Sequence, residues 1–256
     1  MTAPKIWITG ASSGIGQAFA HHYATRGATL GLVARRVGVL DALAARLPGT
    51  HAVYAADVCQ PESLAAAAAD FCNRFGVPDI VIANAGVSVG TLTEERDDYE
   101  AFETVFLTNV LGMVGSFRPF VADMRRRGSG QLVGISSVAG VRGLPGAGAY
   151  SASKAAVSRY LESLRVELRH SGVKVTEIRP GFIRTPMTDV NPYRMPFLLE
   201  VDDAVRRFAA AIDRGVSQAT IPWQMAVVAK LLPLVPNTLY DRYAARARRK
   251  PRRLEG

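Results

Sequence analysis

Short apolar runs alternate with longer helical patterns along most of this 256-residue chain, and this rhythm limits its fold more than any other feature. Several runs are continuously apolar, as is typical of strands in a parallel sheet that helices cover on both faces. A repeated strand–helix order implies right-handed crossovers and a doubly wound α/β sheet. The predicted strands are residues 6–9, 29–34, 52–55, 80–83, 131–136 and 174–178, with a weaker seventh at 219–222, expected at an edge because it contains a proline.

The predicted helices cover about 15–26, 37–47, 61–74, 98–127 and 151–170. The stretch at about 182–200 has no clear periodicity and contains three prolines, and loops of this length in a compact domain are usually functional or disordered. We therefore expect a substrate lid there. The predicted organisation is one dinucleotide-binding and catalytic domain over residues 1–222, followed at 223–256 by an apolar helix and a basic tail.

Composition excludes several classes of protein. With 48% apolar residues the chain can bury a core without covalent staples. Cys59 and Cys72 lack the spacing of a metal site, so we expect two buried, reduced thiols and no metal. The N-terminus enters an apolar strand almost at once, which is unlike a signal peptide, and no stretch reaches the roughly 20 apolar residues of a spanning helix. We expect a soluble, cytoplasmic protein.

The net charge of +9 is unevenly distributed, because residues 242–253 hold seven basic side chains and no acidic one. Without them the chain has 24 basic and 22 acidic residues, which argues against a nucleic-acid-binding face spread over the fold. Two interpretations of the C-terminal segment stay open. One is a helix that closes over the substrate cleft or contacts another subunit, followed by a solvated tail. The other is an interfacial anchor whose apolar side chains and arginines contact an anionic membrane. Nucleic-acid binding by the tail is disfavoured, since Tyr240 and Tyr243 are its only aromatic residues.

A glycine-rich turn, with glycines at 10, 14 and 16, joins the first predicted strand to the first helix. Backbone amides at a helix N-terminus favour phosphate, and glycine lets the backbone approach a pyrophosphate closely. The spacing Gly-x3-Gly-x-Gly differs from the commoner Gly-x-Gly-x2-Gly, and a simple structural turn is the alternative. Position in the first strand–helix unit favours the phosphate site.

The second predicted strand ends in Arg35 and Arg36, where an NAD-preferring site usually places a carboxylate. Arginine pairs bidentately with phosphate, so these residues predict a 2′-phosphate and hence NADP(H), with an exposed basic loop as the alternative. Asp57 follows the third strand and the run Asn84-Ala85-Gly86 follows the fourth. Small and polar residues at strand C-termini line the crevice that binds ligands in such sheets, although turn chemistry also explains them.

The residues best suited to catalysis are Tyr150 and Lys154, with Ser137 thirteen residues upstream of the tyrosine. Side chains four residues apart lie on one face of a helix. A phenol titrates near 10, and a neighbouring ammonium lowers its pKa, which general acid–base work near neutral pH requires. We therefore expect Lys154 to lower the pKa of Tyr150, so that the site can move a proton together with a hydride.

In this order, these residues resemble the motifs of the classical short-chain dehydrogenase/reductase family, from the glycine turn to about residue 190. The resemblance implies a Rossmann-type three-layer sandwich with a seven-stranded, mainly parallel sheet and a nicotinamide cofactor. It implies that Tyr150 is the general acid or base and that Ser137 holds the substrate oxygen. Lys154 would bond the nicotinamide ribose, and Asn109 would support a water linking Lys154 to solvent. The implied cofactor-binding residues are Gly10, Ser12, Ser13, Gly14, Ile15, Gly16, Arg35, Arg36, Asp57, Asn84, Ala85, Gly86, Tyr150, Lys154, Pro180, Gly181, Ile183 and Thr185.

The expected activity is NADP(H)-dependent hydride transfer between a carbonyl and a secondary alcohol. An apolar small-molecule substrate is favoured by apolar lid residues at 182, 187, 195 and 197–199, which alternatively pack only against the core. The family pairs the helix at 151–170 and the one before it across a two-fold axis, which implies a homodimer or homotetramer. A non-catalytic nucleotide sensor or scaffold on the same fold is the alternative, because fold alone does not define function.

Overall fold

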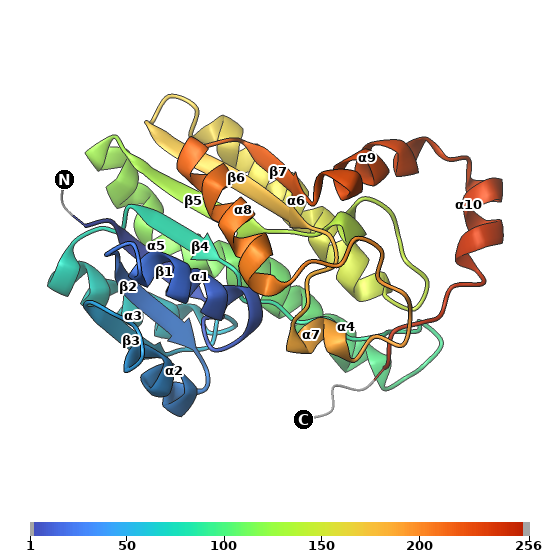
Figure 1. Cartoon of the computed structure of the whole chain (residues 1–256), viewed down its shortest axis with the longest axis horizontal. Coiled ribbons are helices and arrows are strands. Elements are labelled where there is room, and N and C mark those ends of the chain that lie inside the picture. Colours follow the sequence, from blue (N-terminus) through green and yellow to red (C-terminus); the bar gives the residue numbers. More distant parts are fainter. Residues whose placement is uncertain (1–2, 253–256) are drawn as a thin grey trace.

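The apolar runs predicted as strands lie side by side in one seven-stranded sheet with helices on both faces (Figure 1). The computed structural model describes residues 3–252, and Arg253, the last member of the basic run, lies outside them. Each neighbouring pair is parallel, in the order β3-β2-β1-β4-β5-β6-β7, so the weak seventh strand is an edge as predicted. The strands are β1 (Lys5–Thr9), β2 (Thr29–Ala34), β3 (His51–Ala55), β4 (Ile80–Ala83), β5 (Gly130–Ile135), β6 (Val173–Pro180) and β7 (Gln218–Ile221).

The chain reverses its direction of travel across the sheet between β1 and β4, because β2 and β3 extend to one side and β4 to β7 to the other. In open α/β sheets a ligand binds at such a switch point, beyond the carboxyl ends of the strands. The loops after β1, β2 and β4 all reach this crevice. The topology therefore brings together the glycine turn, the arginine pair and the run at 84–86.

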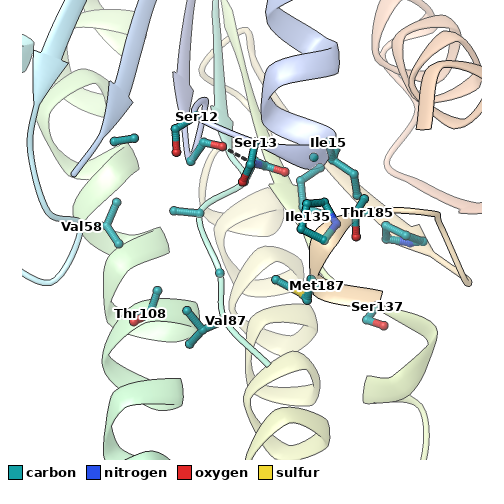
Figure 2. A pocket seen from close by; sticks show the side chains of 18 of the residues that line it. Ser12, Ser13, Ile15, Val58, Val87, Thr108, Ile135, Ser137, Thr185 and Met187 are labelled. Carbon is teal, nitrogen blue, oxygen red and sulfur yellow. Dashed lines mark hydrogen bonds between the residues drawn. The ribbon is translucent and has the colours of Figure 1, made fainter. Parts of the chain in front are cut away.

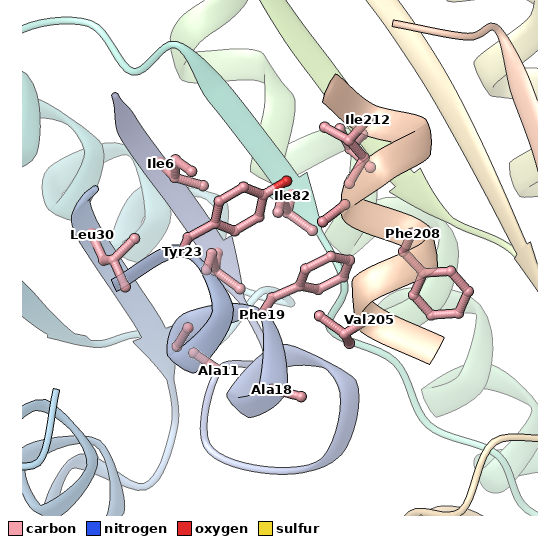
Figure 3. Close-up of a cluster of buried hydrophobic side chains, with 14 of the residues drawn as sticks. Ile6, Ala11, Ala18, Phe19, Tyr23, Leu30, Ile82, Val205, Phe208 and Ile212 are labelled. Carbon is pink, nitrogen blue, oxygen red and sulfur yellow. The ribbon is translucent and has the colours of Figure 1, made fainter. Parts of the chain in front are cut away.

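Two hydrophobic clusters form the core, one on each face, and residues in a strand point to them alternately. Ile6 and Ile8 of β1 face the first cluster, whereas Trp7 between them faces the second. In the first, Phe19 and Tyr23 of α1 pack against residues of α8 such as Phe208 (Figure 3). The helices on this face are α1 (Gly14–Ala24), α2 (Val37–Ala44) and α8 (Val201–Arg214), and those on the other are α3 (Pro61–Phe75), α5 (Gly112–Arg127) and α6 (Gly148–Glu167).

The helix predicted at 98–127 is continuous, but a π-helical turn interrupts its α-helical hydrogen-bond pattern. It consists of α4 (Asp98–Phe106), a π-helical turn η1 (Leu107–Leu111) and α5. Within residues 3–252 it is the one helix long and apolar enough to cross a membrane, whereas we expected none. Its apolar character has a second explanation, because Met113, Phe117 and Phe120 of α5 are buried in the core of the sheet.

The lid predicted at 182–200 is a loop whose two ends pair at Ile183 and Leu199 and which contains the short helix α7 (Pro186–Asp189). Beyond β7 the chain forms α9 (Trp223–Leu231), a 3-10 turn η3 (Leu232–Leu234) and α10 (Asn237–Ala244). The apolar helix expected after residue 222 is therefore present. The residues that follow α10 do not form a solvated tail, because their backbone and side chains contact the lid and the loop after β4.

The two thiols are free, as expected, but they are not both buried. Cys59 is exposed and Cys72 is only partly buried. Partial desolvation of the sulfur atom is the largest influence on the pKa of each thiol and raises that pKa. Both groups are therefore poor nucleophiles at neutral pH.

Candidate active site

The glycine turn after β1 is held in a shape that side chains would prevent. Gly10 and Gly14 have φ of +68° and +54°, a region that L-residues other than glycine rarely adopt. A methyl group on Gly16 would lie 2.2 Å from the carbonyl oxygen of Gly10, and one on Gly10 would lie 2.8 Å from Cα of Ala85. Asn84 Nδ2 donates hydrogen bonds to the carbonyl oxygens of Thr9 and Gly10, at 3.1 and 3.3 Å. The turn is thereby packed against the residues that follow β4.

The start of α1 fits a phosphate. Ser13 precedes the helix in an extended conformation and makes no side-chain capping hydrogen bond, and the first turn contains no acidic residue. The backbone N–H groups at this end have no partner within the helix, and the helix dipole favours an anion beside them. Figure 2 shows Ser12, Ser13 and Ile15 at one end of the cleft. These residues fit the pyrophosphate of a dinucleotide.

The cleft has a volume of about 360 Å³ and runs from the arginine pair to Ser137, Tyr150 and Lys154. Two of the predicted site residues do not line the cleft: Gly16, which packs closely within the glycine turn, and Asn109. The other predicted residues in its wall are Gly10, Ser12, Ser13, Gly14, Ile15, Arg35, Arg36, Asp57, Asn84, Ala85, Gly86, Ser137, Tyr150, Lys154, Pro180, Gly181, Ile183 and Thr185. Sequence reasoning missed the wall residues Val58, Val87, Thr104, Thr108 and Thr188, which carry no motif and reach the cleft only through the packing of the fold.

One end of the cleft is basic. Arg36 Nη2 donates a hydrogen bond to Ser12 Oγ at 3.2 Å, which links the end of β2 to the glycine turn. Arg35 lies in the cleft wall with Asp57. Its positive charge is close enough to Cys59 to lower the pKa of that thiol slightly. Asp57 Oδ1 accepts the backbone N–H of Cys59 at 2.9 Å, and this bond fixes the carboxylate at the rim. Both guanidiniums are exposed and able to meet a phosphate group.

At the other end, α6 presents Tyr150 and Lys154, and Ser137 lies where β5 passes into the 3-10 turn η2 (Val138–Gly140). Ser137 Oγ accepts the backbone N–H of Ala139 at 3.1 Å, which fixes the serine at the start of the turn. Lys154 is 5% exposed, and its ammonium donates a hydrogen bond to the carbonyl oxygen of Ile135 at 2.9 Å. Its Nζ atom is 5.7 Å from the ring centre of Tyr150. The three predicted groups therefore share one wall of the cleft.

The expected effect of Lys154 on Tyr150 is wrong for this structure. Burial is the largest influence on the Tyr150 hydroxyl and raises its pKa, and a hydrogen bond with Ser137 only partly opposes it. The Lys154 ammonium donates its hydrogen bond to the backbone of β5, not to the phenol. Burial also lowers the pKa of Lys154 itself, to about 8. A second phenol missed by sequence reasoning, Tyr193 of the lid, raises the pKa of Tyr150 further.

Asn109 lies in the π-helical turn and is fully buried. Its Oδ1 accepts the backbone N–H of Val87 at 2.8 Å, and its Nδ2 donates to the Val87 carbonyl oxygen and to Ser153 Oγ, both at 3.0 Å. A methyl group on Gly86 would lie 3.1 Å from this Oδ1 and 3.6 Å from Lys154 Nζ. Asn109 therefore lies next to the active-site lysine and anchors the loop after β4.

The lowered pKa of Lys154 predicts a pH-dependent stability difference between wild type and Lys154→Met. The pKa falls from 10.5 to about 8 on folding, so the unfolded chain binds more protons between these values and wild-type stability rises with pH there. At pH 7.5 we expect Lys154→Met to be more stable, and the gap should shrink by about 3 kcal/mol by pH 10.5. Urea unfolding of both proteins at each pH measures this, and a constant gap would contradict the lowered pKa.

A glycine turn at the switch point of a parallel sheet, facing a Ser–Tyr–Lys group, defines a dinucleotide-binding oxidoreductase site. Comparison with known proteins agrees. Residues 4–194 match the family model for short chain dehydrogenase. An uncharacterized oxidoreductase of Myxococcus xanthus is 41% identical over 244 residues, covering 94% of this chain and 96% of the relative. The chain belongs to the short-chain dehydrogenase family and is an oxidoreductase of that type.

Solved structures give the same assignment. A short-chain dehydrogenase from Streptomyces avermitilis is similar with a TM-score of 0.80 and 26% identity, covering 96% of this chain and 98% of the other. A short-chain dehydrogenase from Sphingobium yanoikuyae, solved with NADPH, has a TM-score of 0.77 and 28% identity, with 96% of each chain covered. The Rossmann-type fold expected from the sequence is therefore confirmed.

Proposed function

We propose that this oxidoreductase uses NADP(H) to interconvert a carbonyl compound and a secondary alcohol, with Tyr150 as general acid in reduction and general base in oxidation. The observation that carries the proposal is geometric. Ser137, Tyr150 and Lys154 line the same cleft as the glycine turn, so a dinucleotide bound along the turn would extend toward them.

The cofactor, when bound, supplies or accepts the hydride. Ser137 Oγ and Tyr150 Oη donate hydrogen bonds to the substrate oxygen, which gains negative charge as the carbonyl is reduced. Tyr150 then transfers its proton to that oxygen. Lys154, whose Nζ lies 5.7 Å from the ring centre of Tyr150, binds sugar hydroxyls of the cofactor beside the phenol. Asn109 holds the loop after β4 beside the lysine and supports a water that links Lys154 to solvent.

The raised pKa of Tyr150 favours reduction at neutral pH. A phenol that keeps its proton is ready to act as an acid, whereas oxidation requires the phenolate. Oxidation of an alcohol should therefore need a higher pH than reduction of the corresponding carbonyl.

Arg35 and Arg36 support a preference for NADP(H) over NAD(H). They lie at the end of β2, where the wall of the cleft presents two guanidiniums and where the sequence has no carboxylate. The Sphingobium yanoikuyae relative, solved with NADPH, is consistent with this preference.

An apolar substrate is supported by the lid. Met187 and Ile183 line the cleft, and the rings of Phe182 and Tyr193 contact each other in the lid, with centroids 6.5 Å apart. Flexible and aromatic side chains of this kind suit a hydrophobic pocket.

A homodimer or homotetramer is supported by exposed apolar side chains on the helices that the family pairs. Tyr99 and Phe102 of α4, Leu111 of η1 and Val166 of α6 are exposed in the single chain. Peripheral membrane contact stays a prediction, consistent with the exposed Trp223, Leu231 and Leu234 of α9 and η3. The cytoplasmic location also stays a prediction.

A panel of carbonyls and alcohols, followed by the absorbance of reduced nicotinamide with NAD and NADP in parallel, tests the proposal. We expect NADPH-dependent reduction of apolar ketones or aldehydes near neutral pH. NADP(H) binding without turnover of any member would favour the non-catalytic sensor or scaffold, and a strong NAD preference would contradict the role of the arginines.

A further inference from the structure

The last described residues form what we call the C-terminal strap, residues 248–252, which crosses from the lid to the loop after β4. Arg248 Nη1 donates to the carbonyl oxygen of Pro192 in the lid at 3.2 Å. At the other side, the Gly90 N–H donates to the carbonyl oxygen of Pro251 at 2.8 Å, and Arg252 pairs with Asp98 and Glu95 at 2.9 and 3.0 Å. Figure 1 shows this segment returning from α10 past α7 and α4.

Two glycines far apart in the sequence give the strap its path. A methyl group on Gly90 would lie 2.3 Å from the carbonyl oxygen of Lys250, and one on Gly146 would lie 2.9 Å from Cβ of Arg249. Side chains at these positions would push the strap away. Gly146 lies two residues before the start of α6, the helix that carries Tyr150 and Lys154.

The strap places Lys250 between the lid and the loop after β4. Its Nζ donates to Ser88 Oγ at 2.9 Å and to the carbonyl oxygen of Met187 at 3.4 Å. Met187 lines the cleft, as does Val87, which directly precedes Ser88. The ammonium therefore joins the lid to the loop after β4 and lies directly beside the cleft wall, of which Met187 and Val87 are part and Lys250 itself is not.

Lys250 differs from the strap's other cations in its electrostatic environment. Arg252 is neutralised by Asp98 and Glu95, and Arg248 and Arg249 are exposed. Lys250 is half-buried, and no carboxylate among residues 3–252 forms an ion pair with it. Burial lowers its pKa to about 8. A half-buried ammonium with only neutral acceptors is costly, and an anion would offset that cost.

We propose that Lys250 is a specificity-determining residue that binds an anionic group, a carboxylate or a phosphate, on the substrate. The cofactor phosphates are accounted for by the glycine turn and the arginine pair, so the anion belongs to the molecule that carries the carbonyl. This inference rests on the proposed function, since it names the substrate class of that site as acidic carbonyl compounds with an apolar body.

The test compares matched acidic and neutral ketones. The substrates are a series from 4-oxopentanoate to 9-oxodecanoate, each with its methyl ester, and oxoalkyl phosphates of the same lengths. For the best length, wild type should prefer the acid over the ester in kcat/KM, and Lys250→Met should reduce that preference about 10- to 100-fold through the KM of the acid. Lys250→Arg should retain most of it. The phosphate arm separates the two anion types.

Two glycine variants test whether the position of the strap sets the preference for acids. Gly90→Ala should displace the strap and reduce the acid preference as Lys250→Met does. Gly143→Ala is the matched control, because a methyl group there meets nothing within 4 Å, and it should keep the wild-type preference. The proposal is overturned if wild type has no preference for acids, or if Lys250→Met lowers acid and ester turnover equally.

Binding without turnover separates this inference from the proposed function. Calorimetry with decanoate and decanol, which contain no carbonyl to reduce, measures the anion site directly. Tighter binding of decanoate to wild type than to Lys250→Met, by about tenfold or more, would support the site even if no ketone is reduced. Equal binding to both proteins would refute it even if neutral ketones are good substrates.

Discussion

Replacing Tyr150 with Phe should lower turnover by about 10²- to 10⁴-fold, the contribution typical of a general acid or base. The hydroxyl is the atom that delivers the proton, and its raised pKa keeps it protonated at neutral pH. The ring stays in place, so NADP(H) should bind with nearly the wild-type Kd. Steady-state assays and the quenching of protein fluorescence by NADPH measure the two quantities separately.

Tyr160→Phe is the matched control for this variant. Tyr160 lies on the same helix and packs against the core rather than the cleft, so the same substitution should leave turnover within about twofold of wild type. Near-wild-type turnover of Tyr150→Phe would refute the assignment of the acid. Loss of NADPH binding in that variant would instead indicate that the phenol supports the shape of the cleft.

The sheet and the cofactor side of the site could be predicted because their signals are local. Each buried parallel strand is a continuous apolar run, and the residues after β1, β2 and β4 meet at one edge whatever the details of packing. Helix α8 was visible in the same way but was overlooked. Its Val201, Val205, Phe208 and Ile212 recur at helical spacing, immediately after a lid that contains three prolines.

The pKa of Tyr150 and the hydrogen bond of Lys154 could not be predicted, because they depend on which partners compete for each group in the folded chain. Spacing places Lys154 near Tyr150. It does not reveal that the ammonium bonds to the Ile135 carbonyl oxygen, or that burial is the largest influence on the pKa of the phenol. The strap is a second case. A run of arginines in the sequence suggests a solvated tail, and the roles of Gly90 and Gly146 emerge only when the folded chain brings three distant segments together.

Replacing both Arg35 and Arg36 with Ala should raise the KM for NADP(H) by at least about 10²-fold and change the KM for NAD(H) by less than about threefold. The 2′-phosphate would lose a charge-assisted hydrogen bond to each guanidinium. For groups this exposed, each bond contributes about 10-fold to NADP(H) affinity. The single variant Arg36→Ala also loses the bond to Ser12 Oγ, so we expect it to be the more damaging of the two single changes.

Arg46→Ala provides the control for a general loss of positive charge. Arg46 is exposed shortly after α2 and does not line the cleft, so its removal lowers the net charge by one without touching the site. Its KM for NADP(H) should change little, and raising the ionic strength should weaken NADP(H) binding to wild type more than to the double variant, because only wild type retains the phosphate pair. An NADP(H) preference that survives the double substitution would move the source of specificity away from the end of β2. The carboxylate of Asp57, held at the rim by the Cys59 amide, would then be the next residue to change.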